Sequence, residues 1–424
     1  MPRKMSIVVV LAILLVAPVA LSMGFNESQP EKSVHLLAMK PKDIPGLVSD
    51  PSFRAIKNSL KGYSLYTVDL ENILQEAKKG VLSLEIRGRK FELVLTPDTR
   101  TLLPGATKRP IYTFRGSVKG IPESRVALTV SDRALFVTIW VLGEWYYLRS
   151  TKTKLNGRPV VIGYSSKDKL FKNLSYRDEV IKIKKENTHT IQNTNSKNTM
   201  SPHKGLKSIE PFVFPSEPVY ITIELVAGYD TEFEQISSDP ESEVINIMAS
   251  VNDIFEKYGI YFQINTIKEF PVNGNDACEA LSDFSPEAQE VMNIYSADLS
   301  FLFSGKIFSN GIIGCAYQYQ GRVAVGQMNS DGYGFNRIYV ATHELGHTLD
   351  ADHEEEDPGK IEGYNHAYSW YYWQYHTTFY TIMWSSASDE YKWPEFSDKY
   401  NHGDETHDNA RRIKETAPIV AGYN

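Results

Sequence analysis

The chain has very few cysteines. Its 424 residues include only Cys278 and Cys315, which excludes a metal cluster built from several cysteine thiolates. In an exported protein the pair could close one disulfide, or the two could remain buried free thiols. The residues leave both alternatives open.

Long apolar runs are also missing after the first 22 residues. Arg3 and Lys4 precede an apolar run at 7–21, and small residues follow, a pattern typical of a secretory signal. The run is short of the ~20 residues that a transmembrane helix needs. We therefore expect residues 1–22 to be a cleaved signal peptide and the protein to be secreted, with no stable membrane span. The alternative is an N-terminal anchor at the outer face of a membrane.

Charge is divided unevenly along the chain. Residues 1–209 contain 34 Lys and Arg against 17 Asp and Glu, or +17, whereas residues 210–424 contain 11 against 35, or −24. Such a division favours two units that attract each other. Internal repeats are absent, and we expect no nucleic-acid partner.

The first unit, residues 23–164, is predicted to be a β-rich domain. Residues 83–97 alternate apolar and polar side chains with period 2, and residues 125–149 form apolar runs broken at Ser131-Asp132 and Gly143. Residues 70–80 indicate a short helix that ends at Gly80.

Residues 165–212 differ in composition. They are polar and lysine-rich, with many Asn, Thr and Ser, and such a segment buries little apolar surface. We expect a flexible basic linker that contains the activation cleavage site. The dibasic pair Lys184-Lys185 is the most evident candidate.

The second unit, residues 213–424, alternates predicted strands with predicted helices and so belongs to the α/β (α+β) class. Strands are expected at 219–226, 260–270, 298–305, 312–317 and 322–328, and helices at 242–259, 335–349 and 404–415.

The predicted helix at 335–349 leads into the sequence ATHELGHTLDADH at 341–353. His343 and His347 are four residues apart and so share one face of the helix. His353 can join them only if the helix ends and the chain turns back. Glycine would suit that turn, but the residue there is Asp350, one of the non-glycine types that adopt positive φ most readily. We expect the turn to form.

Three histidines leave the fourth position of a tetrahedral zinc ion open for water, as in catalytic sites. Glu344 follows the first histidine and could act as the general base that takes a proton from this water. The pattern therefore predicts one catalytic Zn²⁺ held by His343, His347 and His353.

With these residues the chain resembles the metzincin metalloproteases, in which a methionine lies in a tight turn beneath the metal. YTIMWSS at 380–386 supplies Met383. Position 385 is serine where astacins and serralysins have a tyrosine ligand, so the resemblance is to the reprolysin-like (adamalysin) branch. It implies a mixed, mostly parallel sheet with an active-site helix. It also implies substrate binding along an edge strand at Gly314, Cys315, Ala316 and Tyr317, and near Ser385.

The resemblance extends to residues 91–105 and 114–130, which look like the propeptide domain of that branch. It implies a zymogen whose own propeptide is an inhibitor and chaperone, and whose substrate is a protein or peptide. Because no cysteine precedes residue 278, a cysteine-to-zinc latency switch is excluded. We expect the basic propeptide to dock on the acidic protease by charge, and salt to weaken the contact.

Two alternatives remain open. The acidic run at 354–357 could bind Ca²⁺ or be a solvated loop. The chain could also be a catalytically silent zinc-binding module of the same fold, an alternative that Asp350 favours and Glu344 opposes. The aromatic-rich residues 364–380 are interpreted as a loop folded over the methionine turn, with a cleft or membrane contact as alternatives.

Overall fold

The structure is a computed structural model of the chain. It describes residues 36–170, 177–182, 220–309, 311–318, 321–329, 335–355, 363–373, 376–385 and 391–424. The predicted signal peptide at 1–22, the pair Lys184-Lys185, most of the predicted linker and Glu356 and Asp357 lie outside the described residues. In the described ranges, no helix combines the length and apolar character needed to cross a bilayer.

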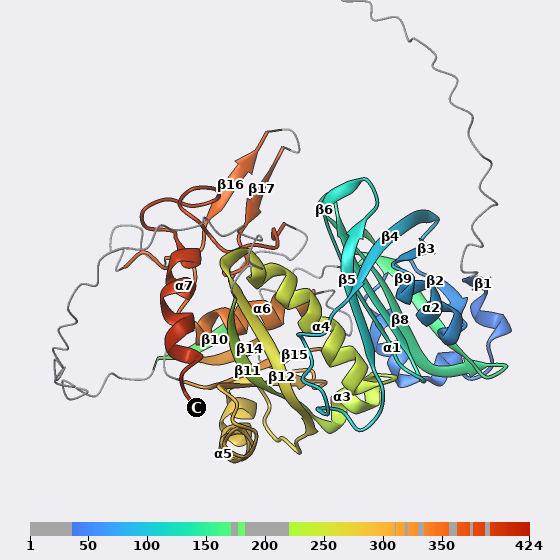
Figure 1. Cartoon of the computed structure of the whole chain (residues 1–424), viewed down its shortest axis with the longest axis horizontal. Helices are drawn as coiled ribbons and strands as arrows, with labels where there is room; N and C mark the ends of the chain where they lie inside the picture. The colour runs from blue at the N-terminus through green and yellow to red at the C-terminus, as the bar shows by residue number, and fades with distance from the viewer. Residues whose placement is uncertain are drawn as a thin grey trace, which may run out of the picture. The chain divides into compact units, whose positions relative to one another are not determined.

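Within residues 36–170 the chain forms a nine-stranded antiparallel sheet with the order β1-β2-β9-β8-β7-β6-β5-β4-β3 (Figure 1). The strands are β1 (Leu37–Met39), β2 (Ser64–Thr67), β3 (Val81–Ile86), β4 (Arg89–Pro97), β5 (Tyr112–Val118), β6 (Ile121–Val130), β7 (Leu135–Val141), β8 (Glu144–Leu155) and β9 (Arg158–Ser165). The short helices are η1 (Pro41–Asp43), η2 (Leu47–Ser49), α1 (Pro51–Lys57), α2 (Leu70–Lys78) and η3 (Ser166–Asp168).

The sequence pattern explains these elements. In β4 the side chains of Phe91, Leu93 and Leu95 are buried and their neighbours are exposed or half-buried, which is the predicted period of 2. The breaks predicted at Ser131-Asp132 and Gly143 separate β6, β7 and β8. Helix α1 was not predicted from the sequence.

The described residues from 177 onward form a six-stranded sheet with the order β10-β14-β15-β13-β11-β12. Neighbouring strands are parallel except for β14 and β15, which are antiparallel. The strands are β10 (Arg177–Lys182), β11 (Ile221–Tyr229), β12 (Ile260–Glu269), β13 (Leu299–Ser304), β14 (Ile312–Gln318) and β15 (Val323–Gln327); a separate hairpin joins β16 (Ser369–Tyr372) and β17 (Thr377–Tyr380). The helices are α3 (Thr231–Ile236), α4 (Pro240–Phe255), η4 (Glu256–Tyr258), α5 (Ala277–Tyr295), α6 (Arg337–Thr348) and α7 (Asn409–Val420).

The mixed α/β class is confirmed, but several elements were not expected, among them α3, α5, β10 and the hairpin β16–β17. Strand β10 lies inside the predicted linker, so the expectation of a flexible segment needs correction at Arg177–Lys182. Helix α5 was missed because Pro286 lies inside it, although Asp276 caps its first turn by accepting a hydrogen bond from the Glu279 N–H.

Helix α4 packs against both sheets, between β5, β6 and β7 on one side and β12 and α6 on the other (Figure 1). One hydrophobic cluster joins Trp140 and Trp145 of the nine-stranded sheet to Ile247 of α4 and Tyr339 of α6. The described residues from 36 onward accordingly form one compact unit.

Ion pairs across this contact follow the charge division of the sequence. Arg115 of β5 pairs with Asp253 and Glu256 at the end of α4. Arg149 of β8 pairs with Glu243 in the first turn of α4. The basic half therefore supplies arginines and the acidic half supplies carboxylates, at positions that the sequence could not specify.

Candidate metal centre

Helix α6 carries the motif. It begins after Asn336, whose side-chain oxygen accepts a hydrogen bond of 3.1 Å from the Ile338 N–H and so caps the first turn. Every residue of α6 is buried. The helix therefore fixes the backbone of His343, Glu344 and His347 inside the molecule.

The helix ends in a turn built around Asp350. Its φ is 66°, and the Asp350 and Ala351 N–H groups donate to the carbonyls of His347 (2.9 Å) and Gly346 (3.0 Å). This is the Schellman pattern, with aspartate where glycine is usual. The Asp350 carboxylate also pairs with Arg412 of α7. The expected turn is thus present.

The turn brings His353 against the two helical histidines. The Nε2 atoms of His343, His347 and His353 lie 2.9, 3.0 and 3.1 Å from one another. Ligand nitrogens of one tetrahedral zinc ion, with bonds of ~2.0–2.1 Å, would lie about 3.3 Å apart. Among the described residues, these three form the group that could hold a metal ion.

The other ring nitrogens of two of these histidines face backbone carbonyls. Nδ1 of His343 lies 2.9 Å from the Ile382 oxygen, and Nδ1 of His347 lies 2.9 Å from the Ala351 oxygen. A carbonyl can only accept, so each Nδ1 carries the proton and each Nε2 presents a lone pair. Lone pairs that converge at ~3 Å repel unless a cation lies between them, so the donor set fits zinc.

Glu344 lies beside this group and is buried. Its carboxylate contacts the backbone of Gly314 in β14 so closely that a Cβ atom at that position would overlap Oε1 of Glu344. Gly314 was expected from the resemblance to bind substrate; the contact with Glu344 is an additional reason for glycine that the sequence did not reveal.

Met383 lies beneath the helix. A Cβ atom on Gly346 would lie 2.8 Å from its Sδ atom and 2.9 Å from Cε1 of Phe396. Met383 is fully buried, and the preceding residue, Ile382, provides the carbonyl that orients His343. The turn therefore supports both the helix backbone and one ring.

Ser385 is held by the start of the acidic run. Its N–H and hydroxyl donate to the two carboxylate oxygens of Glu354 at 2.7 and 2.8 Å. Glu355 Oε2 lies 3.2 Å from Nε2 of His407. Both carboxylates thus contact protein groups, an arrangement that the sequence did not suggest.

Strand β14 has a neighbour on each side. It pairs with β15 through Gly314, Cys315 and Ala316, and its other side pairs in parallel with β10. In the register, Cys315 lies opposite Glu179 and Tyr317 opposite Ile181. The strand expected to be a free edge is therefore covered by residues from the predicted linker.

The two cysteines form a disulfide that joins Cys278 of α5 to Cys315 of β14. Because Cys315 follows Gly314, this bond ties the strand beside Glu344 to the helix on the far side of the sheet. Which of the two cysteine alternatives applies was decided only by the tertiary structure.

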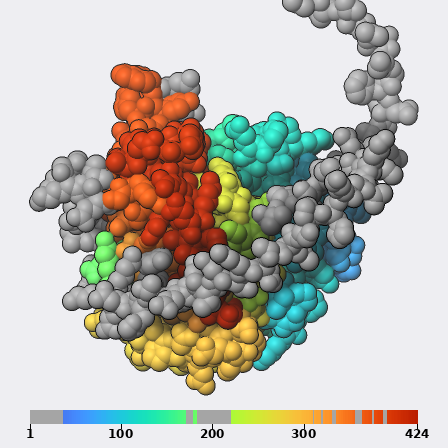
Figure 2. Space-filling model, turned by 60° about the vertical axis from the view of Figure 1, so that its left-hand side comes forward, coloured from blue at the N-terminus to red at the C-terminus, as the bar shows by residue number. Residues whose placement is uncertain are grey.

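The aromatic-rich segment forms the hairpin β16–β17, which leads directly into Ile382 and Met383. In Figure 2 the hairpin (orange) projects beside the red surface of α7. Trp373, at its turn, is 77% exposed. The Thr381 N–H donates to the Tyr368 oxygen (2.9 Å), which closes the base of the hairpin next to the methionine turn.

Comparison with known proteins links part of the chain to one family. Residues 221–397 match the family model of the M12 metallopeptidases. This segment, with its three-histidine group, is similar to the metzincin-like metallopeptidases. The match contains the three histidines, Glu344 and Met383.

Solved structures show weaker likenesses to this chain. Metalloproteinase-II from Bacteroides fragilis is similar over 79% of this chain and 90% of its own, with a TM-score of 0.47 and 12% identity. A chain from the structure of a chaperone–substrate complex is similar over 49% of this chain, with a TM-score of 0.39 and 15% identity. The likeness spans only 35% of that second chain's length. No curated protein matched.

Proposed function

We propose that this protein is a secreted zinc-dependent endopeptidase made as a zymogen. The observation that carries the proposal is the convergence of three Nε2 atoms, 2.9–3.1 Å apart, beside the buried Glu344. Zinc binding without catalysis would not require a carboxylate at that position.

His343, His347 and His353 would hold the ion, and Ile382 and Ala351 keep two of the rings in the tautomer that presents Nε2. When bound, zinc would lower the pKa of water and polarise the scissile carbonyl. Glu344 would take the proton from the attacking water and pass it to the leaving amine. Strand β14 would pair with the substrate backbone. Since Glu354 and Glu355 contact Ser385 and His407, we do not include calcium in this function.

The zymogen state is supported by strand β10. It occupies the side of β14 on which an extended substrate would have to pair. Lys182, the last residue of β10, lies 3.3 Å from Asp352, which precedes the ligand His353. Residues 34–182 would thus inhibit the protease until the chain is cut after β10, and the domain ahead of the linker would act as its propeptide.

Export is supported by the pattern of residues 1–22 and by the disulfide, which is typical of oxidising compartments.

The runner-up is a silent zinc-binding module. Its single supporting feature is Asp350. With the turn at Asp350, however, His353 lies beside the other two histidines. A binding module would tolerate loss of Glu344 without any functional change.

The deciding experiment uses the full chain and a Glu344→Ala variant. Both are treated briefly with trypsin, which cuts after the lysines of the linker, and a serine-protease inhibitor is then added. Hydrolysis of unfolded casein is measured with and without a zinc chelator. We expect cleavage only by the nicked wild type, abolished by chelation and restored by zinc. Equal zinc content in both proteins with no cleavage by either would overturn the proposal in favour of a binding module.

A further inference from the structure

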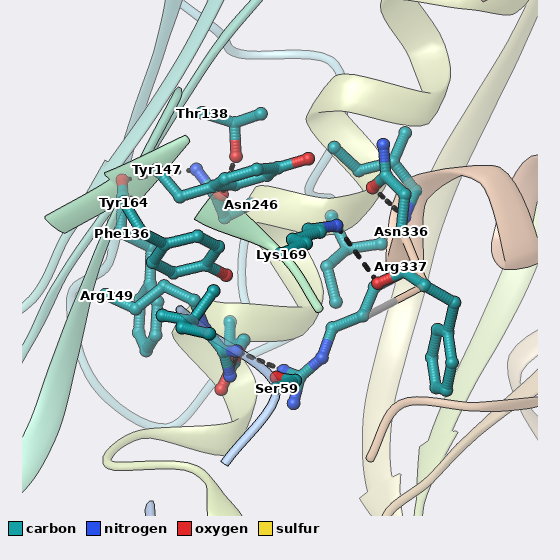
Figure 3. Close-up of a pocket in the computed structure, with 15 residues that line it drawn as sticks. Ser59, Phe136, Thr138, Tyr147, Arg149, Tyr164, Lys169, Asn246, Asn336 and Arg337 are labelled. Atoms are coloured by element: carbon teal, nitrogen blue, oxygen red, sulfur yellow. Dashed lines mark hydrogen bonds and ion pairs between the residues drawn. The ribbon is translucent and has the colours of Figure 1, made fainter. Parts of the chain in front are cut away.

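A small cavity lies between the nine-stranded sheet and the first turn of α6, and none of the three histidines lines it (Figure 3). It measures about 40 Å³ in the space that the centre of a water molecule can reach. One water needs ~10–15 Å³ by this measure, so the cavity has room for a few waters or one small ion. It is lined by Ser59, Leu60, Phe136, Thr138, Tyr147, Arg149, Tyr164, Lys169, Glu243, Asn246, Ile247, Phe335, Asn336, Arg337 and Ile338.

Among the described residues that line this cavity, positive charges outnumber negative ones. They include three cationic side chains, Arg149, Lys169 and Arg337, and one carboxylate, Glu243. Arg149 and Arg337 are only 7% and 8% exposed. Burying an excess of positive charge is costly unless an anion accompanies it.

The Glu243 carboxylate is shared unequally between Arg149 and Arg337. Its Oε1 atom accepts from Nη2 of Arg149 and from Nη1 of Arg337, the latter at 2.5 Å. Burial opposes the charge of Arg149, but Glu243 and Tyr164 together more than offset it and raise the pKa of Arg149. Burial and, next, the Arg149 guanidinium lower the pKa of Arg337 to about 10. One carboxylate therefore does not stabilise both guanidinium groups.

Several donors at the cavity lack acceptors. In the described part of the chain, Nε and Nη2 of Arg337 and Nε of Arg149 are buried and have no hydrogen-bond partner. Figure 3 draws Arg149 and Arg337 among the side chains that line the cavity. Arg337 is the first residue of the 12-residue helix α6, whose N-terminus adds partial positive charge. Oε2 of Glu243 also has no partner, which a water could supply.

We propose that this cavity binds a small inorganic anion of the size of chloride, held by Arg337 and Arg149. The anion would link the nine-stranded sheet to the first turn of the zinc helix, because Arg149 belongs to β8 and Arg337 to α6. This proposal does not rest on the peptidase function, since none of the site's residues contacts the three histidines in the contacts described above.

The test uses the full chain with bromide as the probe. Crystals grown in sodium bromide are measured at the bromine absorption edge, and the expected result is an anomalous peak within hydrogen-bond distance of both guanidinium groups. Water alone in the cavity, with bromide found only at surface positions, would overturn the proposal.

Thermal unfolding gives a second readout. At constant ionic strength, replacing sodium gluconate by sodium chloride should raise Tm saturably by about 3 °C, because chloride binds the folded chain and gluconate is too large for the cavity. Equal Tm values in the two salts would contradict the site.

Three variants make this decisive. Arg337→Met should lose the chloride response. Asn336→Asp keeps a capping side chain and adds a carboxylate at the cavity wall, so it should fold and also lose the response. Arg133→Met, which removes an arginine that is 61% exposed, should keep it. A full chloride response in Asn336→Asp would overturn the proposal even if Arg337→Met fails to fold.

Discussion

At the scale of single residues, the site depends on what two positions can accommodate. Gly314 lets β14 approach the Glu344 carboxylate, and Asp350 takes a backbone conformation that favours glycine. The first position excludes any side chain because of a neighbour distant in sequence. The second tolerates aspartate because its carboxylate gains Arg412.

Gly314→Ala should reduce casein hydrolysis by the nicked chain by about 100-fold or more, because the added Cβ must displace the group proposed as general base. Zinc stoichiometry should remain one per chain, since no histidine is touched. Gly422→Ala, where a Cβ would meet nothing closer than 3.5 Å, serves as the matched control. Activity near the wild-type level in Gly314→Ala would show that Glu344 moves without consequence.

Asp350→Val should lower the free energy of unfolding by about 1–3 kcal/mol, because a β-branched residue is strained at positive φ. The variant should also bind zinc more weakly, since the turn positions His353. Urea unfolding and zinc titration check both effects. Asp350→Gly is the control: it relieves the backbone but loses Arg412, so we expect a smaller change. If both variants show the same loss of stability and of zinc affinity, the ion pair with Arg412, and not the backbone conformation, stabilises the turn.

At the scale of elements, strand β14 contacts the proposed general base, the proposed inhibitory strand and the disulfide partner. It contacts Glu344 through Gly314, pairs with β10 along one side and is bonded to α5 through Cys315. A change in β10 or in α5 should therefore alter the position of β14 beside Glu344.

The strand β10 gives a prediction about latency. Val180→Pro combined with Ile181→Pro should raise the activity of the uncut chain at least about 10-fold. In any two adjacent residues of β10, at least one donates its backbone N–H to β14, and proline has no N–H to donate. The control pair Val180→Thr and Ile181→Thr keeps every N–H and should stay latent. Casein hydrolysis by uncut protein is the measurement. If the proline variant is as inactive as the control, inhibition lies elsewhere.

The disulfide gives a prediction about stability. Replacing both Cys278 and Cys315 by serine should lower the free energy of unfolding by about 2–4 kcal/mol, because the bond closes a loop across a sequence separation of 37 residues. Urea unfolding of the oxidised wild type, the reduced wild type and the double variant checks this. Equal midpoints for all three would show that the bond contributes nothing.

At the scale of the whole molecule, the charge division of the sequence is realised as specific ion pairs on α4. These pairs are mostly buried, so the expectation that salt weakens the contact applies chiefly to the more exposed pair of Arg100 and Glu256. The shared hydrophobic cluster does not depend on screening. Removing one residue of a buried ion pair should therefore weaken the contact between the two halves more than added salt does.

Arg115→Leu should speed release of the N-terminal part from the nicked chain by 100-fold or more, because it leaves the mostly buried Asp253 without its paired arginine, a loss of about 3–5 kcal/mol, while Glu256 keeps only the more exposed Arg100. Size-exclusion chromatography after nicking measures the release. Arg133→Met, at an exposed position, should change little. Retention of the N-terminal part in Arg115→Leu would assign the contact to the apolar cluster.

The sequence by itself determined the local features. The period of apolar residues specified β4 and α4, the charges indicated two attracting halves, and the spacing of His343, His347 and His353 with Glu344 predicted the metal centre. These are short-range properties, because helix geometry and strand alternation depend on neighbours in the chain.

Only the tertiary structure decided what lies opposite each of these features. The pairing of β10 with β14, the contact of Gly314 with Glu344, the ion pair of Asp350 with Arg412 and the cationic cavity at Arg337 all join residues far apart in sequence. Helix α5 was not predicted because the local propensity of Pro286 opposes helix formation. In the folded chain, packing overrides that propensity. Such contacts depend on how whole elements pack, and no local pattern in the chain encodes that packing.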